Sequence, residues 1–183
     1  MMSVSASAPL LGGVALLGYL VHGAVHVRRG TPDELLWACH LGAVLVGVGM
    51  IGGWPVAVTV GVEWLVVGNL LWGIGLAAGA HFMPTSVLTH LLGLGIGLAG
   101  LRIGGIAPGA WRLALPAVLL LFAVSWFVAP ARSRVNLVHG MSHGFDRYFR
   151  FYPLYIGTVL VASAAVFAAT ERVLIRLGFP AVR

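Results

Sequence analysis

The chain has 183 residues, of which 60% are hydrophobic and only 9% are charged, and its mean hydropathy is +0.99. A soluble domain of this size cannot hide so much apolar surface, because a small globule leaves much of its chain at the water boundary. The composition therefore predicts an integral membrane protein. The chain contains no lysine, which excludes a lysine Schiff base, and its single cysteine, Cys39, excludes an internal disulfide.

The formal net charge is +6, a value that in a soluble protein would suggest binding to nucleic acid. Here the arginines lie between apolar runs, so we expect membrane lipid with anionic headgroups, and no nucleic acid, as the partner. The sequence leaves open whether the chain forms a homo-oligomer or joins a partner subunit in the membrane.

Six segments are apolar enough to cross about 30 Å of hydrocarbon, which takes about 20 residues in a helix. They are residues 9–27, 34–52, 55–79, 84–101, 113–129 and 153–170. These segments predict an all-α fold, a polytopic bundle of six transmembrane helices that forms one integral membrane domain over residues 1–183. We expect the first segment to be a retained helix, because no charged region precedes it and its apolar stretch is too long for a signal peptide.

The start of the second segment carries a helix signal. Thr31-Pro32-Asp33-Glu34 predicts a capping box with proline at the first helical position.

The arginines divide almost evenly between the two ends of the predicted bundle, so the predicted orientation in the membrane depends on Arg28 and Arg29, directly after the first helix. This pair favours a cytoplasmic position for that end of a multi-pass protein in the inner (plasma) membrane.

The histidines show the strongest pattern in the sequence. With alternating helix directions, all seven belong to one face of the membrane, and the opposite loops contain none. His22 and His26, like His139 and His143, have the i, i+4 spacing that brings two imidazoles onto one helix face, as metal ligation requires. Together with His40 and His81, these residues are candidate ligands for iron, zinc or copper, and haem held by two histidines is a further version.

A second candidate site joins Cys39 and His90. At a rise of about 1.5 Å per residue, both residues lie about 7–9 Å below the same face, on the second and fourth predicted helices. A thiol and an imidazole at equal depth suit a Cys–His pair, in which the imidazole deprotonates the thiol and the thiolate attacks an ester or thioester carbonyl. Within the third predicted helix, Glu63 is either a proton relay or a protonated group bonded to a neighbouring helix.

Several short motifs follow one another in a fixed order. They are Leu36-Trp37-Ala38-Cys39-His40, Glu63-Trp64, Gly68-Asn69-Leu70-Leu71-Trp72, Phe82-Met83-Pro84, His90, Val135-Asn136-Leu137 and Tyr152-Pro153-Leu154-Tyr155. This layout, over residues 34–165, resembles the YwaF-type six-helix integral membrane proteins of bacteria. Those proteins are related to transmembrane phospholipid acyltransferases and to androgen-induced intramembrane lipid hydrolases.

The resemblance implies roles for three residues: Cys39 as the nucleophile, His90 as its base and Asn136 as the orienting group. The chain departs from the family pattern at His40, where a small amide or acid is commoner, and at Leu91, where glycine is usual. His81, His139 and His143 also exceed that pattern, and these extra imidazoles leave a metal site open.

Three functions follow from these observations. The first is an intramembrane enzyme that transfers or hydrolyses lipid acyl groups through Cys39 and His90, with no cofactor. The second is a histidine-ligated membrane metalloprotein, either an oxidoreductase or a metal carrier. The third is a non-catalytic membrane subunit whose histidines only contact headgroups or a partner.

Overall fold

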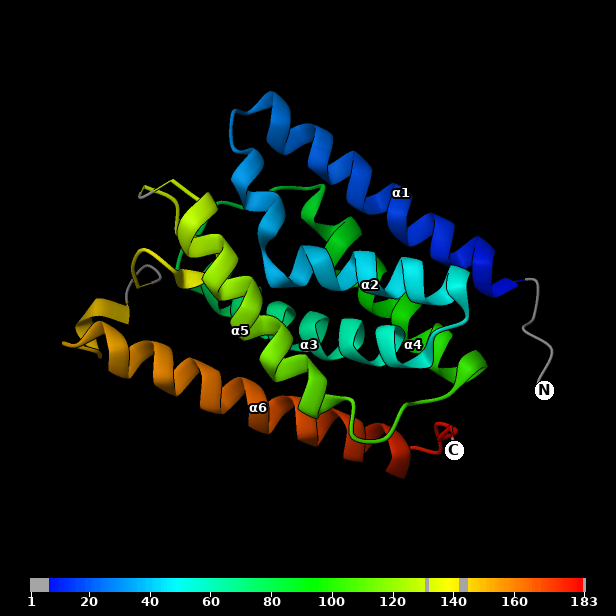
Figure 1. Cartoon of the computed structure of the whole chain (residues 1–183). Helices are drawn as coiled ribbons and strands as arrows, with labels where there is room; N and C mark the ends of the chain where they lie inside the picture. Colours follow the sequence, from blue (N-terminus) through cyan, green and yellow to red (C-terminus); the bar gives the residue numbers. More distant parts are fainter. Residues whose placement is uncertain (1–6, 131, 142–144, 183) are drawn as a thin grey trace.

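The computed structural model describes residues 7–130, 132–141 and 145–182, and within them it contains helices but no β-strand (Figure 1). The six main helices are α1 (Ser7–Arg28), α2 (Ala38–Gly52), α3 (Pro55–Ala77), α4 (Gly93–Gly104), α5 (Trp111–Val128) and α6 (Tyr152–Arg176). Three short 3-10 helices are η1 (Pro32–Leu36), η3 (Val135–Leu137) and η4 (Phe145–Arg147), and η2 (Leu88–Leu92) is a π-helical turn that leads directly into α4. The predicted all-helical fold with six helices is confirmed.

Four of these helices, α1, α3, α5 and α6, are long and apolar enough to cross a membrane. The other two apolar helices are shorter, namely α2 and the continuous helix Leu88–Gly104. Large apolar side chains such as Leu10, Phe127 and Val161 point outward from the bundle. An outer surface of this kind is stable against lipid and unfavourable against water, in agreement with a membrane protein.

Helices α2 and α3 form the centre of the bundle. Helix α1 packs against α2, α4 packs against both central helices, and α5 and α6 lie on the far side of α3 (Figure 1). Val46, Val62 and Leu65 are completely buried where α2, α3 and α4 meet. Because successive helices alternate in direction, the segments that follow α1, α3 and α5 gather at one end of the bundle, on the left of Figure 1.

Glycines allow α1, α2 and α3 to approach closely. A Cβ atom on Gly12 of α1 would lie 2.6 Å from the carbonyl oxygen of Gly47 on α2, and one on Gly61 of α3 would lie 2.7 Å from that of Gly42. Side chains at these positions would push the helices apart, so small residues set the spacing. The close α1–α2 contact is what allows side chains near the other end of α1 to reach the start of α2.

The start of the second helix differs from the prediction. The predicted span 34–52 was wrong at its beginning, because Pro32–Leu36 forms a 3-10 turn and Trp37, with φ −53° and ψ 135°, interrupts the helix before Ala38. Thr31 does precede η1 with proline at its first position, but its hydroxyl makes no capping hydrogen bond. The Thr31 hydroxyl is instead hydrogen-bonded to Nδ1 of His26. Thr31 therefore holds a histidine side chain and does not cap a helix.

Other predicted boundaries moved by smaller amounts. The fourth helix covers Leu88–Gly104 instead of 84–101, because Pro84 lies in a turn before it. The sixth helix continues to Arg176, six residues past the predicted end at 170, and so includes Glu171. That extension places a second carboxyl group inside the bundle.

Candidate metal centre

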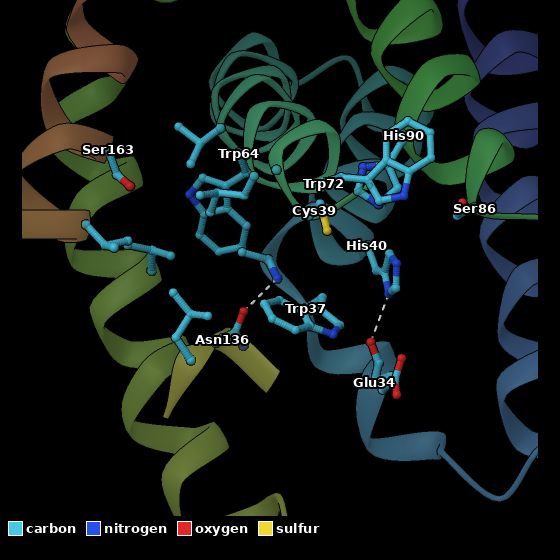
Figure 2. Close-up of a pocket in the computed structure, with 18 of the residues that line it drawn as sticks. Glu34, Trp37, Cys39, His40, Trp64, Trp72, Ser86, His90, Asn136 and Ser163 are labelled. Atoms are coloured by element: carbon cyan, nitrogen blue, oxygen red, sulfur yellow. Dashed lines mark hydrogen bonds between the residues drawn. The ribbon is translucent and has the colours of Figure 1, made fainter. Parts of the chain in front are cut away.

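A cavity of about 370 Å³ lies at the bundle end formed by the segments after α1, α3 and α5. One part of its wall is polar and comes from α1, η1, α2 and the segment 80–90. Its residues include His22, His26, Glu34, Cys39, His40, His81, Ser86 and His90. Figure 2 shows Cys39, His40 and His90 gathered on one side, with Ser163 of α6 across the cavity.

Three buried imidazoles direct the same ring atom toward one another. Nε2 of His22 lies 3.2 Å from Nε2 of His26 and 3.2 Å from Nε2 of His40. The three side chains are 1%, 2% and 5% exposed, respectively. His22 and His26 share one face of α1, as their spacing predicts, and His40 comes from the first turn of α2. The structure thus brings together three of the predicted metal ligands.

The opposite nitrogen of each ring is held by a hydrogen bond. Nδ1 of His22 lies 2.9 Å from the Thr85 hydroxyl oxygen, and Nδ1 of His26 lies 3.0 Å from that of Thr31. Nδ1–H of His40 donates to the carbonyl oxygen of Glu34 at 2.9 Å (Figure 2). Histidines that bind metals characteristically donate their other ring N–H to a carbonyl, carboxylate or similar acceptor, which fixes the ring orientation.

These partners also determine where the lone pairs lie. A carbonyl oxygen only accepts, so Nδ1 of His40 carries the hydrogen and the neutral ring has its lone pair on Nε2. The Thr31 hydroxyl oxygen, 3.0 Å from Nδ1 of His26, can accept from Nδ1–H in the same way. With that hydrogen on Nδ1, His26 also has a lone pair on Nε2. A single hydrogen on Nε2 of His22 could satisfy only one of these two neighbours, whereas a metal ion accepts all three lone pairs.

Cys39 and His90 lie beside this triad. The Cys39 Sγ and one ring nitrogen each of His40 and His90 lie within 4.8 Å of one another, and all three residues are buried. The His90 ring stacks on Trp72, with ring centroids 4.7 Å apart and an interplanar angle of 15°. The predicted juxtaposition of a thiol and an imidazole from two helices is therefore present, although Nδ1 of His90 has no hydrogen-bond partner.

Local backbone structure positions His90. It lies within the π-helical turn η2, which covers Leu88–Leu92 and leads into α4. The Asn69 side chain on α3 donates to the carbonyl oxygen of His90 at 3.1 Å and to that of Leu65 at 2.7 Å. Asn69 thus ties the π turn to α3. Such turns occur frequently at functional sites.

Asn136 occupies a different position from the one its implied role requires. Its Oδ1 accepts the Ala38 backbone N–H at 2.9 Å, and its Nδ2 donates to the Leu36 carbonyl oxygen and the Ser125 hydroxyl. None of these hydrogen bonds reaches His90. Asn136 therefore holds the first residue of α2, next to Cys39, and its role as an orienting group for the imidazole is not supported by these contacts (Figure 2).

The remaining candidate histidines divide into three cases. His81 lines the cavity but belongs to neither group of converging ligand atoms found among the described residues. His139 is not among the residues that line the cavity; its Nε2–H donates to the carbonyl oxygen of Ala129 and its ring packs against Trp126. The structure therefore does not bring His139 to this centre, and His143 lies outside the described residues.

The cavity continues into an apolar arm between α3, α5 and α6. Its lining there includes Trp64, Val118, Phe122, Leu160 and Phe167, together with the hydroxyl-bearing Ser163. An apolar cavity with a few convergent polar groups at one end is typical of a binding site for an amphiphilic molecule. The arrangement gives a polar end with imidazoles and a thiol, and a hydrocarbon-like end.

Thr31, Thr85 and the carbonyl group of Glu34 are site components that the sequence did not reveal. Thr31 offered a weak signal, because it follows His26 by five residues, at the end of the helix. The Thr85 contact joins residues 63 positions apart and has no local signature.

Comparisons with protein-family models, curated proteins and solved structures found no match, so the resemblance to YwaF-type proteins stays a prediction.

Proposed function

We propose that this chain is a six-pass integral membrane protein with a metal centre, in which His22, His26 and His40 bind one transition-metal ion. The observation that carries the proposal is the convergence of three buried Nε2 atoms whose opposite ring nitrogens are all hydrogen-bonded. Tetrahedral zinc with Zn–N bonds of 2.0–2.1 Å separates its nitrogens by about 3.3 Å. The separations from His22 to His26 and from His22 to His40, both 3.2 Å, match that value closely, and all three ligand nitrogens lie within 4.8 Å of one another.

Zinc is the ion that suits this ligand set best. Three imidazoles with one remaining coordination position are typical of catalytic zinc, whereas non-haem iron typically takes a carboxylate beside two histidines. The carboxylate of Glu34 lies 3.6 Å from Nδ1 of His26, on the outer side of the ring. The Glu34 carboxylate therefore lies behind the His26 ring and is not itself positioned as a metal ligand.

The position of the centre favours catalysis over transport. The ligands line a cavity whose other arm is apolar, so a molecule with a hydrocarbon tail and a polar head would bring its head to the ion. A zinc ion held by His22, His26 and His40 would supply Lewis-acid chemistry, activating a water molecule near neutral pH and polarising a carbonyl group. We propose hydrolysis of an acyl ester of a membrane lipid, with His90 accepting the proton of the attacking water and returning it to the leaving alcohol.

Elemental analysis tests the metal centre. Protein purified in detergent without an affinity tag that binds metal should contain about one zinc per chain, and X-ray absorption should show nitrogen in the first coordination shell. One equivalent of iron or copper instead of zinc would show that the ion is wrong, but it would still support a metal centre at these three histidines. Less than a tenth of an equivalent of any transition metal, also after incubation with zinc, would contradict the proposal.

A lipid-turnover assay tests the catalysis. Release of fatty acid from lipids in mixed micelles should stop on chelation and return on addition of zinc, and His90→Ala should lower turnover while zinc stays bound. Turnover that persists without metal would contradict zinc catalysis. Bound zinc without any turnover would favour a metal carrier or a non-catalytic subunit.

A second candidate function is acyl transfer through Cys39, with His90 as its base. It is supported by the proximity of Cys39 Sγ to an imidazole nitrogen of His90 inside the same cavity. This mechanism predicts an acyl group on Cys39, detectable as a mass increase after incubation with lipid, and turnover that resists chelators. Cys39→Ser would abolish that turnover, whereas a zinc hydrolase would retain most of its activity with serine at this position.

A further inference from the structure

Two buried carboxyl groups from different helices lie toward the bundle end opposite the histidine cavity. Glu63 on α3 is 1% exposed, and Glu171 on α6 is 8% exposed. Helices α3 and α6 pack against each other, and Trp64, next to Glu63, and Phe167, one turn before Glu171, belong to one apolar cluster. Glu63 follows Pro55 by eight residues, which places it about 12 Å from the start of α3 at the usual helical rise. The pair is thus inside the bundle and separate from the candidate metal centre.

The hydrogen bonds of these carboxyls are incomplete. The Gly109 backbone N–H donates to Oε1 of Glu171 at 2.7 Å. Oε2 of Glu171 and both carboxyl oxygens of Glu63 are buried without a partner. A buried carboxylate with no hydrogen-bond donor is strongly unfavourable, so these three oxygens require an additional donor or a cation.

The segment between α4 and α5 crosses both carboxyl-bearing helices. Ala107 N–H donates to the Thr59 hydroxyl oxygen on α3, one helical turn before Glu63, and Gly109 N–H donates to Glu171 on α6. Around it, Trp64, Ala110 and Phe167 belong to one apolar cluster. The backbone donors of this segment therefore serve Thr59 and Glu171, and Glu63 is left without a donor in apolar surroundings.

No cation among the described residues compensates the pair. On α4, Arg102 donates to the carbonyl oxygens of Leu177 and Gly178, and on α5 the Arg112 guanidinium lies over the Trp111 ring. Arg172 and Arg176 of α6 make no ion pair with either carboxyl, and the part of α2 packed here carries no charged group. Two negative charges in this environment would repel each other without screening.

We propose that Glu63 and Glu171 form a proton-binding carboxyl pair, in which one proton is held between Glu63 and Oε2 of Glu171. The proton removes one of the two negative charges and supplies the missing O–H donor to an orphaned oxygen. Gly109 N–H stabilises the charge that remains on Glu171. This makes the pair a site for proton uptake and release inside the membrane-embedded bundle, a role that intramembrane carboxyls commonly serve. It does not depend on the metal centre.

Labelling with dicyclohexylcarbodiimide tests this proposal, because the reagent adds to protonated carboxyl groups in apolar surroundings. The full chain in detergent should be labelled at Glu63 at neutral pH, as located by peptide mass, and labelling should decrease at high pH. Glu63→Gln should abolish it, and Glu34→Gln at the cavity should leave it unchanged. The absence of label on Glu63 would overturn the proposal.

Glu171→Gln tests the sharing of the proton. The amide oxygen still accepts the Gly109 N–H, but the like charge is gone, so the pH at which half of the labelling is lost should fall by about one unit or more. An unchanged pH dependence would overturn the sharing, and competition by Na⁺ or K⁺ would assign the pair to a metal cation instead. Infrared spectra of the unmodified chain give a check without variants, since a protonated carboxyl band must be present at neutral pH and absent at high pH.

Discussion

Nε2 of His22 and Nε2 of His40 lie 3.2 Å apart, although 18 residues and a change of helix separate the two histidines. Two neutral imidazoles can share one hydrogen across such a contact, but a third Nε2, that of His26, meets the same atom of His22 at the same distance. One hydrogen on Nε2 of His22 can serve only one of its two neighbours, whereas a metal ion would bind all three nitrogens, which lie within 4.8 Å of one another. The metal-free protein is therefore expected to be less stable than the metal-bound form.

Replacing one ligand tests this coupling between metal and stability. His22→Ala should reduce the bound zinc to below a tenth of an equivalent, because two imidazoles alone hold the ion weakly. It should also remove the stabilisation that added zinc gives, which is about 4 kcal/mol when the free ion is at 1,000 times its dissociation constant. Elemental analysis and thermal unfolding with and without a chelator measure both effects.

The matched control for this variant is His139→Ala. His139 lies outside the cavity and bonds to the Ala129 carbonyl oxygen, so its removal should leave the zinc content at that of the unmodified chain. Equal zinc loss in the two variants would contradict the assignment of His22 as a ligand.

The threonines behind the imidazoles give a second prediction. Thr31→Val and Thr85→Val preserve the side-chain shape but remove the hydroxyls bonded to Nδ1 of His26 and His22. Each should weaken zinc binding by about 10–100-fold, because the rings lose the groups that orient them. Thr158→Val, which removes a hydroxyl bonded only to the Leu154 carbonyl oxygen of its own helix, should leave the affinity unchanged. A competition assay with a zinc-binding dye measures the affinities, and equal values for all three variants would exclude this role.

Sequence periodicity predicted the helices and part of the site. The i, i+4 spacing of His22 and His26 depends only on helix geometry, so their common face could be read directly from the chain. The spacing argument does not carry over to His139, because this residue lies in a turn after the 3-10 helix Val135–Leu137 and not in an α-helix. Periodicity arguments hold only where a regular α-helix forms.

The convergence of α1 with α2 could not be predicted from spacing. It depends on contacts between distant glycines, such as Gly12 against the Gly47 carbonyl oxygen, and on Thr85 reaching back to His22. Equal depth placed Cys39 and His90 correctly with respect to each other, since both lie in one cavity. Depth gave no information on rotation about the helix axis, which decides which imidazoles face inward.

Asn136 provides a third prediction. Its side chain makes three hydrogen bonds that hold the segment before α2, and its positive φ is a conformation that glycine also adopts readily. Asn136→Gly therefore removes the side-chain bonds without straining the backbone. It should destabilise the protein by about 1–3 kcal/mol, because the buried Ser125 hydroxyl and the Ala38 N–H lose their partner. Chemical unfolding measures the loss. If Asn136 only oriented His90, stability would be unchanged and lipid turnover alone would fall.

The contact between Gly68 of α3 and Cys39 of α2 gives the sharpest test of the cavity geometry. A Cβ atom on Gly68 would collide with the Cβ of Cys39, so Gly68→Ala must move α2 away from α3. We expect a loss of about 1–3 kcal/mol in stability from this overpacking, together with weaker zinc binding, because His40 follows Cys39 directly. Gly73→Ala on the same helix meets no atom within 4 Å, so it should be neutral or stabilise by up to about 1 kcal/mol through helix propensity. Thermal unfolding and zinc affinity of the two variants decide the matter: if both behave alike, α2 and α3 are not in the close contact on which the site depends.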